Sequence, residues 1–106
     1  MDALKRRRAT GFLKGLDGAL ATCECAGARD ARASISDALS TLGNNTASFK
    51  ASDYAIARVH ARLARLIGYN TLELSDEAHA AWNHFEDFVY GEARDDLRAV
   101  GGPNVG

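Results

Sequence analysis

The sequence has little of what interrupts helices or builds sheets. Its 106 residues contain a single proline, Pro103, and a proline inside a helix removes a backbone hydrogen bond and clashes with the preceding turn. Isoleucine, valine and threonine together are outnumbered by alanine, whereas strands favour β-branched residues. These shortages argue against a sheet and predict uninterrupted helices.

Cysteine is also scarce, with only Cys23 and Cys25. On a helix their side chains would point about 200° apart, so we expect two reduced thiols and no disulfide framework. Metal-binding cysteines favour wider spacings than Cys-x-Cys, and His79 and His84 lie about 140° apart around a helix. We therefore expect no metal site and no cofactor.

Long apolar runs are absent too, because no stretch approaches the roughly 20 residues that a membrane helix needs. The basic segment Lys5–Arg8 precedes Gly11-Phe12-Leu13 as in a secretory signal, but Lys14 and Asp17 interrupt the apolar region that should follow. We expect a cytoplasmic protein without a membrane segment. The length fits one domain over residues 1–100, with a flexible tail at 101–106.

The strongest pattern in the chain runs from Ser75 to about Val100. Trp82, Phe85 and Phe88 fall on one side of a helix with this register, and aromatic side chains bury the most apolar area per residue. Ser75 is a good N-cap. The pattern predicts a helix whose aromatic stripe lies at the centre of the fold.

Three further segments have apolar residues at helical spacing: 2–25, 28–42 and 52–67. A single rod from 2 to 42 would be about 60 Å long, so we expect a break between Gly15 and Asp30. Gly11, Gly15 and Gly18 form one stripe, which either admits a close backbone or marks a weak helix. The fold class is therefore an all-α, compact bundle of four or five helices with no sheet.

Charge is distributed unevenly, although the net charge is only −1. Up to Gly68 the chain has 11 Lys/Arg against 6 Asp/Glu, and from Tyr69 onward it has 2 against 8. A dipolar chain of this kind can pair its own halves, associate head to tail as a homodimer, or show each half to a different partner.

The basic half offers one candidate interface. Arg58, Arg62 and Arg65 recur at i, i+4 and i+7 on one helix face, and with the Lys5–Arg8 cluster they could hold the phosphates of a nucleic acid. The alternative is a solvated face of three ordinary arginines.

The acidic half offers the other candidate. Glu92 lies one heptad after Phe85, and Asp96 lies one heptad after Val89, so the aromatic stripe turns acidic near Gly91. Three interpretations remain open: the helix emerges into water, the acids pack against Lys5–Arg8, or they are presented to a basic partner. The last interpretation includes Asp95 and Glu86.

His60 is the one polar residue within an apolar helix face, and a carboxylate from the acidic half is its natural partner. No phosphate-binding loop, nucleophile elbow or catalytic triad is evident. We therefore expect a small non-enzymatic protein that binds another protein as an adaptor, regulator or inhibitor, with nucleic-acid binding as the alternative. The candidate binding residues are Arg58, Arg62, Arg65, Glu86, Glu92, Asp95 and Asp96.

Overall fold

The structure is a computed structural model that describes residues 1–44, 46 and 48–100. In this part the chain forms helices and no strand, so the predicted all-α class is confirmed. The predicted tail, 101–106, lies outside the described residues. The helices are α1 (Ala3–Ala21), α2 (Ala28–Leu42), α3 (Phe49–Gly68), α4 (Asp76–Tyr90) and α5 (Arg94–Arg98).

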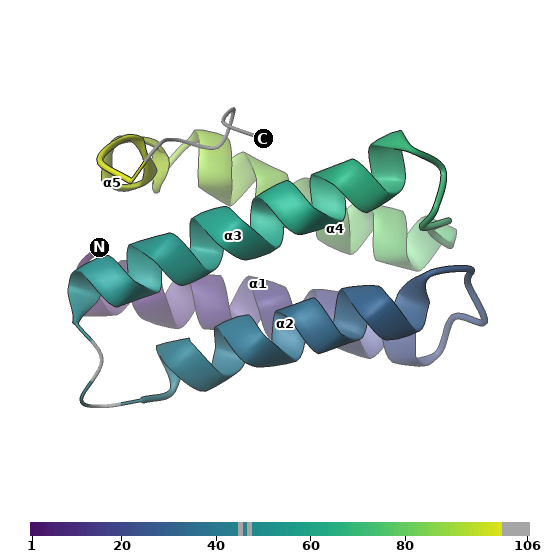
Figure 1. The fold of residues 1–106 in the computed structure, drawn as a ribbon, viewed down its shortest axis with the longest axis horizontal. Helices are drawn as coiled ribbons and strands as arrows, with labels where there is room; N and C mark the ends of the chain where they lie inside the picture. Colours follow the sequence, from purple (N-terminus) through teal and green to yellow (C-terminus); the bar gives the residue numbers. More distant parts are fainter. Residues whose placement is uncertain (45, 47, 101–106) are drawn as a thin grey trace.

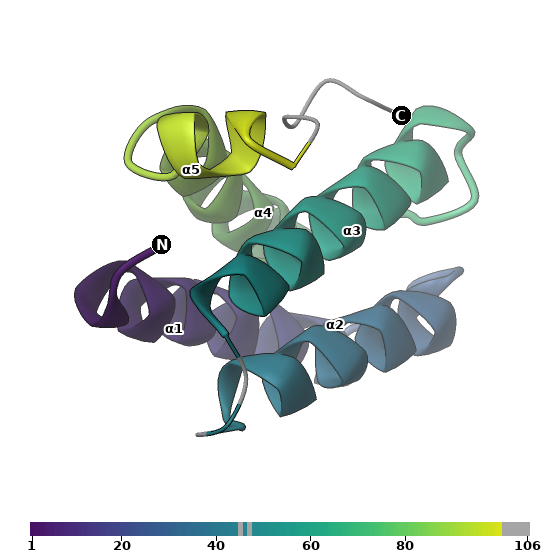
Figure 2. The same cartoon turned by 60° about the vertical axis from the view of Figure 1, so that its left-hand side comes forward.

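Four long helices form the bundle, and the short α5 lies across one end of it (Figure 1). α1 packs against α2 and α4, α2 packs against α3, and α5 packs against α3 and α4. The turned view in Figure 2 shows α5 above the end where α1 and α3 begin. This arrangement brings the first and last helices of the chain to the same end of the molecule.

The aromatic stripe of α4 lies in the core, as predicted. Trp82, Phe85 and Phe88 are only 5%, 0% and 3% exposed. Leucine and isoleucine side chains from the other three long helices are buried in the same core cluster, so burial of apolar area is the main term that holds the bundle together. These residues are Leu13, Leu16, Leu20, Ile35, Ile56 and Leu63.

α3 begins one turn earlier than predicted. Its N-cap is Ser48, whose Oγ accepts a hydrogen bond from the backbone N–H of Ala51 at 3.0 Å. Ser48 and Ser52 are both good N-cap residues, and the earlier start adds the backbone bond from Ser52 N–H to the Ser48 carbonyl. The expected cap was Ser52, with Asp53 in the first turn; with the cap at Ser48, Asp53 lies one turn further into the helix and is buried.

The predicted helix from Ser75 to Val100 starts correctly but is broken. Ser75 caps α4 by accepting from the N–H of Ala78 at 3.2 Å. The chain then leaves the helix at Gly91, where an added Cβ would lie 2.7 Å from the carbonyl oxygen of Asp87. Because the direction changes there, heptad positions counted from Phe85 do not apply beyond Tyr90.

The two cysteines lie in a loop and not on a helix, which corrects the prediction for them. α1 ends at Ala21, within the predicted break, and the loop that follows brings the sulfur atoms of Cys23 and Cys25 together. The expectation of two reduced thiols assumed helical geometry that the loop does not have.

The glycine stripe of α1 does not admit a close backbone within the described part of the chain, so the interpretation as a weak helix remains. Gly11, Gly15 and Gly18 are exposed, the helix continues through them, and nothing in the described part lies within 4 Å of a Cβ built on any of them. Gly27 differs, since its φ is +80° and an added Cβ would overlap the carbonyl oxygen of Thr71. The loop between α1 and α2 thus packs directly on the loop between α3 and α4, where Glu73 N–H also donates to the Ala26 carbonyl at 3.1 Å.

Alanine substitutions at these glycines are expected to have opposite effects. Gly27→Ala should lower the free energy of unfolding by about 1–3 kcal/mol, because it combines a left-handed backbone with an overlap. Gly11→Ala, in the middle of α1 on its exposed face, should raise the free energy of unfolding by roughly 0.5–1 kcal/mol. Urea denaturation of both variants measures this, and equal changes would contradict the close contact at Gly27.

No helix in the described residues combines the length and the apolar character needed to span a bilayer.

Candidate functional site

The three predicted arginines lie together on the outer face of α3. The apolar side of this helix, with Ile56, Val59 and Leu63, is buried. Arg58, Arg62 and Arg65 project from the opposite side and are exposed, because steps of four and three residues return to the same helix face.

A groove between α2 and α3 is the site that these arginines line. Its volume is about 450 Å³. The wall from α2 contributes two hydroxyl side chains and a carboxylate, and the floor is formed by small apolar side chains. The lining residues are Ser34, Asp37, Ala38 and Thr41 of α2, and Ala55, Arg58, Val59, Arg62 and Arg65 of α3.

No ion pair or hydrogen bond within the described part of the chain engages the side chain of Arg58, Arg62 or Arg65. The carboxylate of Asp37 likewise has no partner among these residues. A guanidinium group presents five donors in a fixed fork that suits carboxylates and phosphates. The groove therefore carries three guanidinium groups that form no ion pair or hydrogen bond within the described chain.

The Lys5–Arg8 cluster, in contrast, is largely engaged within the molecule. Lys5 Nζ lies 2.9 Å from Asp96 Oδ2, and Arg8 pairs with Glu92 at 2.6 Å. Arg6 donates to the backbone carbonyls of Leu42 and Asn44 at 3.1 and 3.3 Å. Only one member of the cluster, Arg7, is exposed without such a partner in the described chain.

The acidic candidates are mostly engaged as well. Glu92 and Asp96 form the ion pairs with Arg8 and Lys5, which is the second of the three interpretations drawn from the sequence. Glu86 accepts from His60. Asp95 alone is exposed and unpaired within the described residues, so the acids do not form one free surface.

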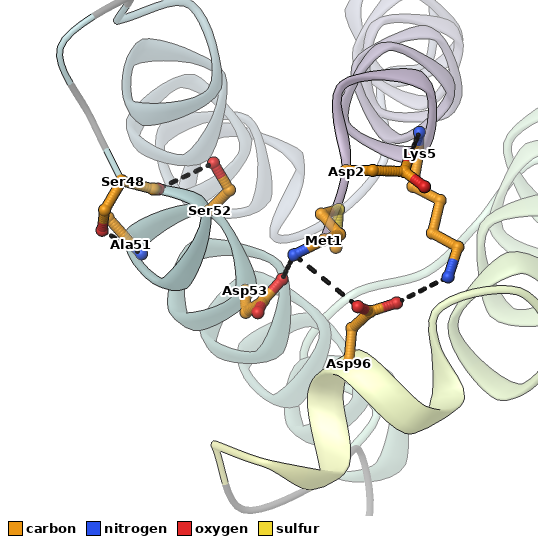
Figure 3. Close-up of polar contacts among 8 residues, drawn as sticks. All are labelled: Met1, Asp2, Lys5, Ser48, Ala51, Ser52, Asp53 and Asp96. Carbon is orange, nitrogen blue, oxygen red and sulfur yellow. Dashed lines mark hydrogen bonds and ion pairs between the residues drawn. The ribbon is translucent and has the colours of Figure 1, made fainter.

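Asp96 also takes part in a partly buried charge cluster at the start of the chain. The Met1 amino group lies 2.6 Å from Asp53 Oδ1 and 3.7 Å from Asp96 Oδ1. Figure 3 shows Met1 between Asp53 of α3 and Asp96 of α5, with Lys5 reaching the same carboxylate. The cluster ties the start of α1 to α3 and α5.

The charges of this cluster shift two pKa values in opposite directions. Burial alone would raise the pKa of Asp96, but the hydrogen bond and charge of Lys5, with the charge of the amino terminus, outweigh it and lower that pKa. The pKa of Lys5 is raised, chiefly by its hydrogen bond to Asp96. Each shift means that the charged form is more favourable in the folded state than in the unfolded state.

Asp96→Asn is expected to show the consequence as a pH-dependent loss of stability. A carboxyl group whose pKa is lower in the folded state stabilises the protein at pH values above its unfolded-state pKa of about 3.9. This stabilisation is lost as the pH falls through the folded-state pKa. We therefore expect Tm to fall by roughly 5 °C at pH 7, with the difference from wild type closing below about pH 4. Thermal denaturation from pH 2 to pH 7 measures it. Asp95→Asn removes the same charge from a neighbour that acts on Lys5 only through its charge, without a hydrogen bond, and should lower Tm much less.

His60 has the carboxylate partner that the sequence predicted. Its ring is 1% exposed, and Nε2 lies 3.2 Å from Glu86 Oε2. The imidazole stacks on Trp82, with ring centroids 5.4 Å apart and an angle of 11° between the planes. Its Nδ1 atom is buried without a partner in the described part. These contacts place His60 in the aromatic core.

A second, smaller hollow lies between α1 and α4. Its volume is about 240 Å³, and the Arg8–Glu92 pair forms part of its wall together with Phe12, His84 and Asp87. The guanidinium of Arg8 also lies 5.8 Å from the Phe12 ring centroid. Arg8 and Glu92 in this wall are already paired with each other, and the hollow is smaller than the groove between α2 and α3.

Sequence reasoning missed the α2 side of the groove. Ser34, Asp37 and Thr41 recur at i, i+3 and i+7, which is the signal of one polar helix face. They could have been connected with the arginines only by knowing that α2 and α3 pack side by side. Among the described residues, no group of three or more His, Cys, Asp or Glu side chains is placed to hold a metal ion.

Comparisons of this chain with protein-family models, with curated proteins and with solved structures return no match.

Proposed function

We propose that this protein acts by binding another protein, as an adaptor, regulator or inhibitor, and that the groove between α2 and α3 contacts the partner. One observation carries the proposal: Arg58, Arg62 and Arg65 share a groove and remain unpaired within the described chain, whereas most other candidate charges are engaged internally. Unpaired arginines around a concave, partly apolar surface are typical of interfaces. We propose no catalytic role.

Nucleic-acid binding is the second candidate, and one observation favours it. Tyr54 is 47% exposed and lies one turn before Arg58, so an aromatic ring for base stacking accompanies the basic face. Two features weigh against it. Asp37 lies in the same groove and would repel phosphates, and the Lys5–Arg8 cluster that should extend the basic surface is engaged internally.

A cytoplasmic location stays a prediction. A second copy of this chain, forming a homodimer, remains the alternative to a different protein as the partner.

The test is co-purification from lysate with wild-type protein and two charge-reversed variants. Arg58→Glu with Arg62→Glu should abolish capture of the partner, because two of the three free donors become repulsive. Arg7→Glu with Arg29→Glu changes the charge equally at exposed positions outside the groove and should capture it as wild type does. Far-UV circular dichroism should be the same for all three proteins.

Nuclease treatment separates the two candidate functions. Capture that survives nuclease and depends on the groove arginines supports a protein partner, whereas capture lost on nuclease treatment supports nucleic acid. If both variants capture the same partner as wild type, the groove is not the interface.

A further inference from the structure

The spacing of the three arginines limits what the groove can hold. Arg58, Arg62 and Arg65 are four and three residues apart on a continuous helix, so their Cα atoms advance by about 6 and 4.5 Å along its axis. A compact anion such as free phosphate would meet all three guanidinium groups only if the side chains converged on it. A row of negative groups about 10 Å long meets each arginine at its own position along the helix.

The opposite wall of the groove has different chemistry. Asp37 lies there between the hydroxyl side chains of Ser34 and Thr41, and the small apolar residues Ala38 and Val59 lie between the two walls. A ligand that fills the groove thus meets cations along α3 and a carboxylate along α2. A uniform polyanion satisfies only the first of these walls and is repelled by the second.

We infer that the groove binds an amphipathic helix of the partner protein. The helix carries Asp or Glu at i, i+4 and i+7 facing α3, lysine along the neighbouring edge facing Asp37, and small apolar residues between them. Carboxylates at i, i+4 and i+7 advance along a helix by the same steps as the three arginines, and grooves of this kind accept helices by their apolar faces. The inference rests on the proposed function and specifies the chemistry of the partner.

Synthetic peptides test this inference with the full chain. The first is an alanine-rich helix of about 18 residues with glutamates at i, i+4 and i+7 and lysines on the neighbouring edge. The second has the same composition with the charges dispersed around the helix, and dT20 is the nucleic-acid probe. By fluorescence anisotropy at low salt, the first peptide should bind at least about fivefold more tightly than the second.

Variants of the protein show which charges of the peptide contact the α3 wall and which contact the α2 wall. Arg62→Ala should weaken the first peptide about fivefold and leave the second unchanged. In the Asp37→Lys variant, lysines on the neighbouring edge of the peptide should no longer increase its affinity. A peptide with lysine in place of the glutamate at i+4 should regain affinity for Arg62→Glu, a rescue that a purely structural role of Arg62 would not produce.

Three outcomes overturn the inference: equal binding of the two peptides, tighter Arg62-dependent binding of dT20, or self-association of the protein that Arg62→Glu disperses, which would make a second copy the occupant. Its failure is distinguishable from failure of the proposed function. If no peptide binds but the arginine variants still lose the captured partner, the helix is wrong and the groove remains the interface. If the peptides bind but capture is unaffected, the proposed function is wrong.

Discussion

Phe85→Ala is expected to lower the free energy of unfolding by about 3–5 kcal/mol. The ring is fully buried in α4, with its centroid 5.9 Å from that of Trp82 and 6.0 Å from that of His60. Alanine removes the largest fully buried side chain of the core and leaves a cavity that rigid neighbours cannot fill. Equilibrium denaturation in urea measures the change.

Tyr69→Ala is the matched control, since its side chain is 78% exposed after the end of α3. We expect a change within about 0.5 kcal/mol. If the two substitutions had similar effects in a well-ordered monomer, the aromatic stripe would not be the centre of the bundle.

Asp53→Asn is expected to cost about 3 kcal/mol, because it breaks a buried ion pair by removing one partner. The Met1 amino group and the Asp53 carboxylate are 2.6 Å apart, with side-chain exposures of 0% and 11%. Asparagine keeps the size of the side chain and an acceptor oxygen but removes the negative charge, which leaves Asp96, at 3.7 Å, as the nearest carboxylate to the ammonium. Thermal and urea denaturation at pH 7 measure the effect.

Asp95→Asn removes the same charge from an exposed position near the same cluster and should change stability by less than about 0.5 kcal/mol. A loss for Asp53→Asn no larger than this control would mean that the pair between Met1 and Asp53 adds nothing to stability. In that case the contact between α1 and α3 would rest on apolar packing alone.

Local signals in the sequence predicted local features well. The bounds of α2, the N-cap at Ser75 and the buried stripe of α4 follow from periodicity and capping, which act over a few neighbouring residues. The partner of His60 was also predicted, because a buried imidazole requires one. Apart from the His60 partner, which lies on another helix, these features depend on groups whose relative placement is fixed by helical geometry.

Predictions that assumed a continuous helix were wrong. Treating Cys23 and Cys25 as helical separated two sulfurs that the loop brings together. Treating Glu92 and Asp96 as later heptads of α4 ignored the turn at Gly91. Glycine tolerates both a helix and a turn, so its presence alone does not decide between them.

The sequence by itself determined the helical class, the aromatic core and the face on which Arg58, Arg62 and Arg65 lie. Only the tertiary structure decided which charges remain free. In the folded chain Lys5 pairs with Asp96 and Arg8 pairs with Glu92. Asp37 lies across the groove from the arginines of α3. The physical reason is range: periodicity fixes which side of a helix a residue occupies, whereas pairing depends on groups many residues apart that only packing brings into contact.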